Sequence, residues 1–313
     1  MSEPLFLDSV MQEKIWGGEK LEKYFGLSIL SRKTGEYWGI SGHNNGPSIV
    51  SNGKYKGKSL SQLFEEEPWL LGDPKDKVFP LLTKILDANE WLSVQVHPYD
   101  NYSLKNESEL GKTECWYILD AEPGSEIILG HNIKDKNSLK TYIANKEWNK
   151  LFNKIPVKKG DFFYIPSGTI HAIGPGLLIL ETQQSSDTTY RVYDFDRLNE
   201  EGKKRELHID KAIDVISVDA PVSYNTHVQA VDNICMTTFV SNDFFTVEKW
   251  EINGYVDLKK ETSYKLFTVI DGEGEIIVDN MSYPLIKGKN FILPSDVISW
   301  SFDGDFSVIV SQK

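Results

Sequence analysis

Four residues in this sequence have side chains and settings suited to binding a metal ion. Gln95 and His97 lie in the segment WLSVQVH, Glu114 lies in KTECWYIL, and His171 follows a Pro-Ser-Gly turn. Two imidazoles, a carboxylate and an amide oxygen form a donor set that suits zinc, with water or substrate filling an open position. Each residue alone would more often be structural, so the prediction depends on the elements that bring the four together.

The segment 91–97 is predicted to be a strand that forms one wall of a polar pocket. Side chains alternate between the two faces of a strand, so Ser93, Gln95 and His97 share one face. The opposite face is apolar and is predicted to belong to the core: Leu92, Val94 and Val96. A buried face normally avoids polar groups that lack partners. The alternative is that the polar face is exposed to solvent, as in many antiparallel sheets.

Neighbouring segments are predicted to carry the other candidate ligands. In the strand expected at 112–119, alternation places Glu114 and Trp116 on the same face. Residues 160–171 read as a short aromatic strand, a turn and then His171. Residues 177–184, LLILETQQ, read as an apolar strand that becomes polar at Glu181.

The remaining pattern is that of a mainly β protein with a few short helices. Apolar spacing and a capping Ser59 predict a helix over 59–70, and similar spacing predicts helices over 137–152 and 207–218. Residues 230–313 read as short strands separated by Gly and Asn turns, which is typical of sandwich or barrel modules.

One module is predicted to occur twice. The template Gly160-x5-Pro166-x4-His171 recurs as Gly288-x5-Pro294-x4-Ser299. Internal similarity of this kind usually indicates duplicated structural units. In the second copy a serine replaces the histidine and Lys265 aligns with Glu114. We therefore expect one metal per chain, in the first module only.

Composition limits the classes of partner. The 313 residues carry a net charge of −12, which argues against nucleic acid because such binding rests on Lys and Arg contacts to phosphate. No apolar run approaches the roughly 20 residues of a membrane span, and no signal peptide is evident. The two cysteines are too few for a disulfide framework. A cytoplasmic protein with a small-molecule substrate is the expectation; the oligomeric state is left open.

The three metal-bearing segments resemble the cupin pattern, in which a small β-barrel presents ligands inward from neighbouring strands. The sequence as a whole resembles the type I mannose-6-phosphate isomerase (phosphomannose isomerase) family. The matching segments are Trp16-Gly17, Leu92–Pro98, Lys112-Thr-Glu114, Pro166–Ala172, Glu181, and Ser186-Asp187 through Arg191 to Arg197. The resemblance implies a mainly β fold class with two cupin-type β-barrel or jelly-roll modules. We expect a catalytic domain at 1–225, with the 137–152 helix as its helical segment, and a degenerate domain at 226–313.

The resemblance also implies the site residues. Its metal site falls on Gln95, His97, Glu114 and His171, its active-site arginine on Arg191, and its acidic residue on Glu181. A basic residue six positions after that arginine falls on Arg197. The implied activity is that of a zinc-dependent intramolecular oxidoreductase, which interconverts mannose 6-phosphate and fructose 6-phosphate through an enediol.

The same residues suit this chemistry on physical grounds. A Lewis-acidic metal stabilises a developing oxyanion, and Glu181 is a candidate for proton transfer or for orienting sugar hydroxyls; the alternative is a salt bridge to Arg191. Arginines bind phosphate well because the planar guanidinium allows bidentate contact. Arg197 could instead be a solvated surface residue. Substrate-binding candidates besides the arginines are Ser93 and Lys112, and the identity of the general base stays open.

Two other functions compete with this interpretation. An iron-dependent cupin oxygenase would favour more histidine and two open positions, whereas Gln95 takes one position here. A non-catalytic sugar-binding cupin would not need a basic pair such as Arg191 and Arg197 beside the pocket.

Overall fold

A computed structural model of the chain describes residues 3–72, 74–199, 201–219, 224–260 and 262–313. The strands form three antiparallel sheets of ten, six and five strands, which confirms the mainly β fold class. No helix within these ranges is long and apolar enough to cross a bilayer. Cys115 and Cys235 are both free thiols.

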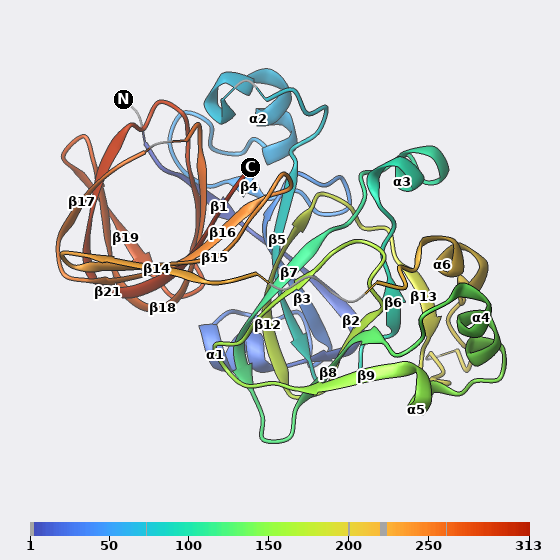
Figure 1. Ribbon diagram of the computed structural model, residues 1–313. Coiled ribbons are helices and arrows are strands. Elements are labelled where there is room, and N and C mark those ends of the chain that lie inside the picture. Colours follow the sequence, from blue (N-terminus) through green and yellow to red (C-terminus); the bar gives the residue numbers. More distant parts are fainter. Residues whose placement is uncertain (1–2, 73, 200, 220–223, 261) are drawn as a thin grey trace.

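The six- and five-stranded sheets together form the N-terminal module (Figure 1). The six-stranded sheet has the order β10-β7-β12-β5-β3-β2, with bounds Phe162–Ile165, Glu114–Ala121, Leu177–Gln184, Leu81–Ala88, Thr34–Ser41 and Val10–Gly18. The five-stranded sheet has the order β13-β6-β11-β8-β9, with bounds Tyr190–Tyr193, Val94–Val96, His171–Ile173, Glu126–His131 and Phe152–Pro156. A buried cluster between the sheets takes residues from both, including Trp116, Ile118, Ile127 and Ile173.

The ten-stranded sheet is formed mainly by the C-terminal third of the chain. Its strands from this part are β14 His227–Val231, β15 Ile234–Ser241, β16 Thr246–Asn253, β17 Val256–Lys259, β18 Lys265–Val278, β19 Met281–Ile286, β20 Asn290–Leu293 and β21 Ser299–Gln312. The short strands expected here are thus joined by two strands, β18 and β21, of 14 residues each. Both contain glycines in left-handed backbone, Gly272 and Gly304, where the long strands can bend.

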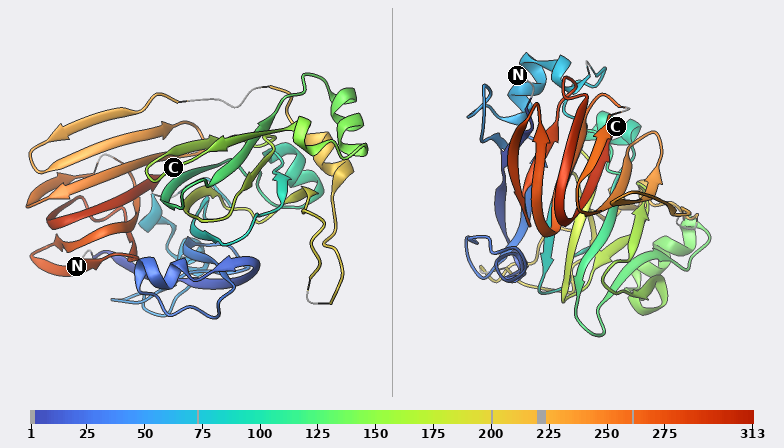
Figure 2. Two further views of the ribbon diagram at one scale, coloured as in Figure 1. Left: turned by 90° about the horizontal axis from the view of Figure 1, so that it is seen from below. Right: turned by 90° about the vertical axis from the view of Figure 1, so that its left-hand side faces the viewer.

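The N-terminus joins this same sheet. β1 (Leu5–Asp8) pairs with β20, and β4 (Ile49–Val50) pairs with β1. Figure 2 shows the start of the chain beside the red C-terminal strands. The division of the chain at residues 225 and 226 stays a prediction, and β1 and β4 are segments that cross it.

The helices cover sheet surfaces or connect strands. Their bounds are α1 Lys20–Phe25, α2 Leu60–Glu66, η1 Pro68–Leu71, α3 Asp100–Asn106, α4 Lys136–Ala144, α5 Trp148–Leu151 and α6 Ile209–Val215. The predicted cap is confirmed, because the Ser59 side chain accepts from Gln62 N in a capping box. Helices α4, α5 and α6 lie at the end of the molecule away from the C-terminal sheet (Figure 1). They pack on the outer face of the five-stranded sheet.

Three helix predictions were wrong in extent, and the helix expected at 207–218 is observed as the shorter α6. The single helix expected at 137–152 is split into α4 and α5, because Lys146 between them adopts a left-handed backbone with φ of 56°. The helix expected at 59–70 ends at Glu66, before Pro68, and a 3₁₀ turn follows, since proline lacks the N–H that a continuing helix needs.

The predicted repeat is confirmed by strand register. Ile165, just before Pro166, lies opposite Glu114, and Leu293, just before Pro294, lies opposite Lys265. The preceding glycines also make equivalent bonds: Gly160 N donates to Ile118 O at 2.9 Å, and Gly288 N donates to Val269 O at 2.8 Å. Lys265 therefore occupies the position of Glu114 in the second copy.

Candidate active site

Two rows of side chains face each other across the N-terminal module. In the five-stranded sheet, Gln95 on β6 lies opposite His171 on β11 and opposite Arg191 on β13. In the six-stranded sheet, Glu181 on β12 lies opposite Lys84 on β5 and Trp116 on β7. The Trp116 and His171 rings meet edge to face with centroids 5.5 Å apart, so the two rows line one space.

That space is a cavity of about 200 Å³. Its wall combines the rows with further polar and aromatic residues: Lys14, Trp16, Glu36, Lys84, Ser93, Gln95, Lys112, Trp116, His171, Glu181, Asp187, Thr189, Arg191 and Arg205. The polar face of the 91–97 strand is therefore a pocket wall, and the alternative of a solvent-exposed face is wrong. Val94 and Val96 are buried on the other side, as expected. The expectation for Leu92 was wrong: it lines the cavity, because the strand begins only at Val94 and alternation does not extend to residue 92.

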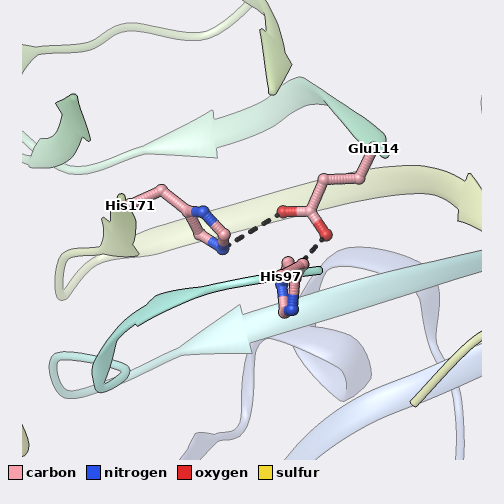
Figure 3. A group of neighbouring side chains, drawn as sticks. All are labelled: His97, Glu114 and His171. Carbon is pink, nitrogen blue, oxygen red and sulfur yellow. Dashed lines mark ion pairs between the residues drawn. The ribbon is translucent and has the colours of Figure 1, made fainter. Parts of the chain in front are cut away.

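A buried triad of possible metal ligands, His97, Glu114 and His171, adjoins the cavity through His171 (Figure 3). Glu114 Oε1 is 3.4 Å from His171 Nε2, and Glu114 Oε2 is 3.5 Å from His97 Nε2. One donor atom from each residue lies within 4.8 Å of the others. Glu114 Oε1 is buried without a hydrogen-bond partner among the described residues. A buried carboxylate oxygen with no donor is costly, so the triad fits a cation.

Backbone carbonyls orient both imidazoles of the triad. His97 Nδ1 donates to Thr188 O and His171 Nδ1 donates to Thr169 O, each at 2.9 Å. A carbonyl can only accept, so each proton resides on Nδ1 and Nε2 is left as a lone-pair donor. In both histidines this Nε2 is the atom directed at Glu114 (Figure 3).

The electrostatics keep these imidazoles neutral. Burial, followed by the Lys112 ammonium, lowers the pKa of His171 to about 4. Burial, Lys112 and His171 hold the pKa of His97 well below its usual range. A metal ligand must be an unprotonated imidazole, so both histidines are ready to bind at neutral pH.

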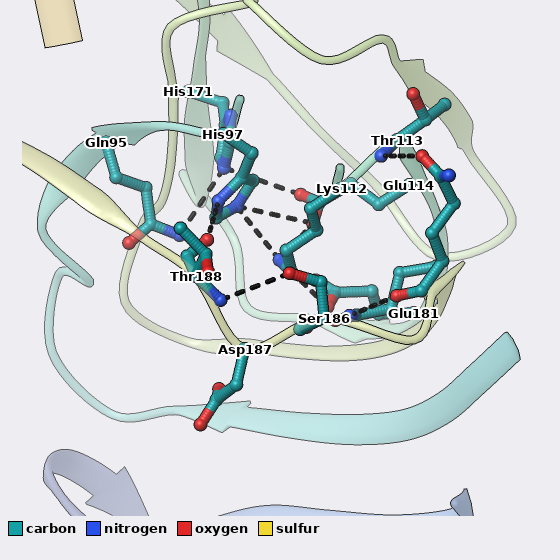
Figure 4. A network of polar contacts seen from close by, with 12 residues as sticks. Gln95, His97, Lys112, Thr113, Glu114, His171, Glu181, Ser186, Asp187 and Thr188 are labelled. Carbon is teal, nitrogen blue, oxygen red and sulfur yellow. Dashed lines mark hydrogen bonds and ion pairs between the residues drawn. The ribbon is translucent and has the colours of Figure 1, made fainter. Parts of the chain in front are cut away.

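Lys112 is the cation nearest to the triad. Its Nζ lies 2.9 Å from His97 Nε2 and donates to Glu114 (Figure 4). Burial and the neighbouring Glu181 carboxylate raise the pKa of Glu114 to about 7 in spite of Lys112. Lys112, which the sequence suggested as a substrate-binding residue, thus places a positive charge in contact with two candidate metal ligands.

The amide of Gln95 lies beside the triad. Its Nε2 is 3.4 Å from His171 Nε2, and its Oε1 accepts from Ser93 Oγ at 3.2 Å. A half-turn of the amide about its terminal bond would direct the oxygen toward the candidate metal ligands. Ser93 is buried and also lines the cavity.

Glu109 fixes the loop that orients His97. Its Oε2 accepts from Ser186 Oγ at 3.1 Å, from Asp187 N at 3.1 Å and from Thr188 Oγ1 at 2.8 Å. Thr188 is the residue whose carbonyl accepts from His97. Sequence reasoning did not identify Glu109, because it lies outside the strands and its role appears only through the loop that it holds.

Glu181 is paired with lysines. Its Oε1 is 3.2 Å from Lys84 Nζ and 3.7 Å from Lys112 Nζ, and its Oε2 accepts from Trp116 Nε1 at 2.9 Å. Burial alone would raise its pKa, but Lys112 and Lys84 lower the pKa to about 2. The alternative prediction, a salt bridge between Glu181 and Arg191, is wrong. Arg191 Nη1 instead donates to Glu206 O at 2.8 Å.

The two expected arginines have different positions. Arg191 lines the cavity, and its Nε is buried without a hydrogen-bond partner in the described chain. Arg197 is not among the lining residues. Its Nη2 donates to Asp194 Oδ1 at 2.5 Å, and its Nη1 is 3.7 Å from Glu90 Oε2.

Sequence reasoning missed several lining residues, above all Lys84. A lysine within the apolar segment LLTKIL was a usable signal, because charged side chains are seldom buried unless paired. Lys84 is buried and pairs with Glu181. Glu36 and Arg205 offered no comparable signal, since their places depend on contacts between distant segments.

The family "Phosphomannose isomerase type I, catalytic domain" matches residues 5–117, and "Mannose-6-phosphate isomerase, cupin domain" matches residues 235–313. Mannose-6-phosphate isomerase of Streptococcus mutans is 55% identical over 313 residues, with 100% of this chain and 99% of the relative covered. ManA of Bacillus subtilis is 48% identical over 313 residues, with 99% of each covered. A crystal structure of the Bacillus subtilis mannose 6-phosphate isomerase superposes with a TM-score of 0.98 at 46% identity, and 100% of each chain is covered.

Proposed function

The chain belongs to the type I mannose-6-phosphate isomerase family, and on this premise we propose how its cavity performs the reaction. The protein is an aldose–ketose isomerase that interconverts mannose 6-phosphate and fructose 6-phosphate. The observation that carries the assignment to this site is the buried His97, Glu114 and His171 triad, whose His171 lines the same cavity as Arg191.

We infer that the triad and Gln95 hold one zinc ion. Two neutral imidazoles, a carboxylate and an amide oxygen match the ligand types that zinc accepts. A zinc ion at this place supplies a Lewis acid for the oxyanion that develops as the carbonyl becomes an enediol. The metal is tied to the first module, because Lys265 stands at the Glu114 position of the second copy and an ammonium repels a cation.

The second module supports the fold instead. Its interior is closed by stacked aromatic rings, with Phe267 and Phe291 parallel at 4.7 Å. Lys265 Nζ donates to Gln312 Oε1 at 2.6 Å within this module. On its outer side the module packs against β7 and β12 of the catalytic sheet through residues such as Phe239 and Leu266. This contact stiffens the sheet that carries Glu114 and Glu181.

The chain's own groups position the sugar phosphate. Arg191 is proposed to bind the phosphate, since it is cationic, lines the cavity and has a buried donor without a partner. Ser93, Lys112 and Glu181 are proposed to contact the sugar hydroxyls and the reacting carbons. The walls formed by Trp16 and Trp116 keep water from these carbons.

Glu181 is proposed to orient hydroxyls and the two lysines. A carboxylate with a pKa of about 2 is a weak base at neutral pH. Ionised Glu181 accepts from Trp116 and keeps Lys84 and Lys112 close to the reacting carbons.

A coupled assay tests the function directly. Formation of fructose 6-phosphate from mannose 6-phosphate is followed through a dehydrogenase-linked signal, before and after dialysis against a chelator. We expect activity that falls on chelation and returns on addition of zinc. Absence of fructose 6-phosphate formation by the zinc-loaded protein would refute the assignment.

A further inference from the structure

We propose that Arg205 is a second phosphate-binding residue, which acts beside Arg191 and is held in place by Asp194. The proposal deepens the function above and rests on it. The family resemblance implied Arg197 as the second basic residue, whereas the geometry points to Arg205.

Backbone pairing brings Arg205 to the cavity. His208 N donates to Arg191 O at 2.8 Å, and Arg191 N donates to His208 Nδ1 at 3.1 Å. Arg191 Nη1 also donates to Glu206 O. The segment 205–208 therefore runs alongside β13, and both Arg191 and Arg205 line the cavity that adjoins the metal triad.

Asp194 fixes the Arg205 guanidinium from behind. Arg205 Nε donates to Asp194 Oδ2 at 2.8 Å, and Nη2 donates to Oδ1 at 2.6 Å. This bidentate pair sets the plane of the guanidinium. Nη1 donates to none of the described residues, and the side chain keeps 25% of its surface exposed. A fixed guanidinium with a free edge on a cavity is suited to receive an anion.

A strained turn places Arg197 on the other side of Asp194. Phe195 and Asp196 adopt left-handed φ values of 55° and 54°, and Arg197 N donates to Asp194 O at 3.1 Å. Two such non-glycine residues in sequence are costly, and strain of this kind clusters at functional sites. The turn reverses the chain direction, and Arg197 Nη2 therefore donates to Asp194 Oδ1 at 2.5 Å. Arg197 thus supports Asp194 from outside the cavity.

The arginines around Asp194 carry more positive charge than this carboxylate neutralises, which favours binding of a dianion. Three guanidiniums, those of Arg191, Arg197 and Arg205, surround the one buried carboxylate of Asp194. The other acidic groups nearby are Glu90, 3.7 Å from Arg197 and mostly exposed, Glu206, whose charge acts on Arg191, and Asp187, which lines the cavity. Burial and the nearby Arg205 lower the pKa of Arg191, which reflects the crowding of like charges. A phosphate dianion between Arg191 and Arg205 would relieve this repulsion.

The test compares two arginines that share one carboxylate. Arg205→Gln and Arg197→Gln each remove one partner of Asp194 and leave the other. The probes are mannitol 6-phosphate, which has the phosphate but no carbonyl to isomerise, and mannitol, which has neither. Each is measured as a competitive inhibitor of mannose 6-phosphate isomerisation by the zinc-loaded enzyme.

We expect Arg205→Gln to raise the inhibition constant of mannitol 6-phosphate roughly tenfold or more, as for loss of a charge-assisted contact. The inhibition constant of mannitol should stay within about twofold of wild type, because only the phosphate contact is lost. Arg197→Gln should raise the inhibition constant of mannitol 6-phosphate by less than Arg205→Gln does. An unchanged constant for mannitol 6-phosphate in Arg205→Gln, an equal rise for both probes, or a larger effect of Arg197→Gln would overturn the proposal. Failure of the wild-type enzyme to isomerise mannose 6-phosphate would instead refute the underlying function.

Discussion

Lys84 and Glu181 lie directly opposite each other on β5 and β12, and their Nζ and Oε1 atoms are 3.2 Å apart. Both side chains are almost completely buried. Burial alone would lower the pKa of Lys84, but Glu181 and Glu36 raise it well above its usual range. This pair therefore carries both charges at neutral pH, and the catalytic sheet presents a fixed cation beside a fixed anion to the sugar.

Replacing either triad histidine should abolish metal binding and activity together. His97→Ala and His171→Ala each remove a proposed ligand from a different segment, since His97 directly follows β6 and His171 begins β11, so neither can substitute for the other. Metal content of the purified variants, measured by emission spectrometry, checks this. His227→Ala, at an exposed position on β14, is the matched control and should retain both properties. Full metal occupancy in an inactive His97 or His171 variant would disprove the ligand assignment.

Wild-type protein should hold one tightly bound metal per chain. The second copy of the module presents Ser299 and Lys265 where the first presents His171 and Glu114. Equilibrium dialysis followed by elemental analysis gives the stoichiometry. A second tightly bound ion that survives mutation of His97 and His171 would contradict this prediction.

Arg191→Ala should weaken the enzyme toward the phosphorylated sugar while the metal stays bound. One charge-assisted contact contributes about 1.5–3 kcal/mol, which corresponds to roughly a tenfold to hundredfold rise in KM. Steady-state kinetics and metal content are measured on the same preparation. Kinetics close to those of wild type would place the phosphate elsewhere, and loss of the metal would show that Arg191 supports the ligand strands instead.

Glu109→Gln should lower metal affinity without removing any ligand. Glu109 accepts three hydrogen bonds from the loop that ends in the Thr188 carbonyl, which orients His97. Loss of such outer partners costs about tenfold to hundredfold in metal affinity. Competition with a chromogenic chelator measures the affinity, and Glu126→Gln, in a surface pair with Lys154, is the control. If the Glu109→Gln variant binds the metal as tightly as wild type, the loop keeps its position without Glu109.

Asp87→Asn should stabilise the protein at neutral pH. Burial raises the pKa of Asp87 from 3.8 to about 6, against the backbone N–H of Lys20 and Leu21, which favour the charged form. Between about pH 4 and 6 the unfolded chain releases this proton before the folded protein does, so the free energy of unfolding falls as pH rises. Above pH 6 the ionised Asp87 lowers the free energy of unfolding by its full amount, about 1–3 kcal/mol.

Urea unfolding of wild type and Asp87→Asn at pH 4.5 and pH 7 measures this effect. The amide oxygen of asparagine can still accept from Lys20 N, so the helix start is preserved. The variant should be the more stable protein at pH 7, and its advantage should be smaller at pH 4.5. A variant that is less stable than wild type at pH 7 would show that the charge itself is needed there.

Period-two alternation predicted most of the catalytic framework. It placed Ser93, Gln95 and His97 on one face and located the strand at 177–184 with its bounds as observed. Alternation succeeds in β6 and β12 because one face of each strand lines the cavity and the other face packs in a core. The repeat template also predicted the position of Lys265, because glycine and proline fix the turn that sets the register.

The rest depends on contacts between segments that are distant in sequence. The partners of Glu181 are Lys84, Lys112 and Trp116, from two neighbouring strands, and nothing in the sequence around Glu181 distinguishes them from Arg191. Arg205 reaches the cavity only because the chain returns alongside β13. The break between α4 and α5 results from the left-handed backbone of Lys146, and the spacing of apolar side chains carries no information about that conformation.

The place of β1 has a consequence for how the protein forms in the cell. Leu5 and Phe6 pair with Ile292 and Phe291, which are synthesised much later than β1. One edge of β1 can pair with β4 early, but the edge that meets β20 stays unpaired until β20 has been synthesised. Closing so long a loop is slow, and a waiting apolar strand is open to pairing with other chains. Translation speed and chaperone supply should therefore govern the yield of active enzyme more than the stability of the finished fold does.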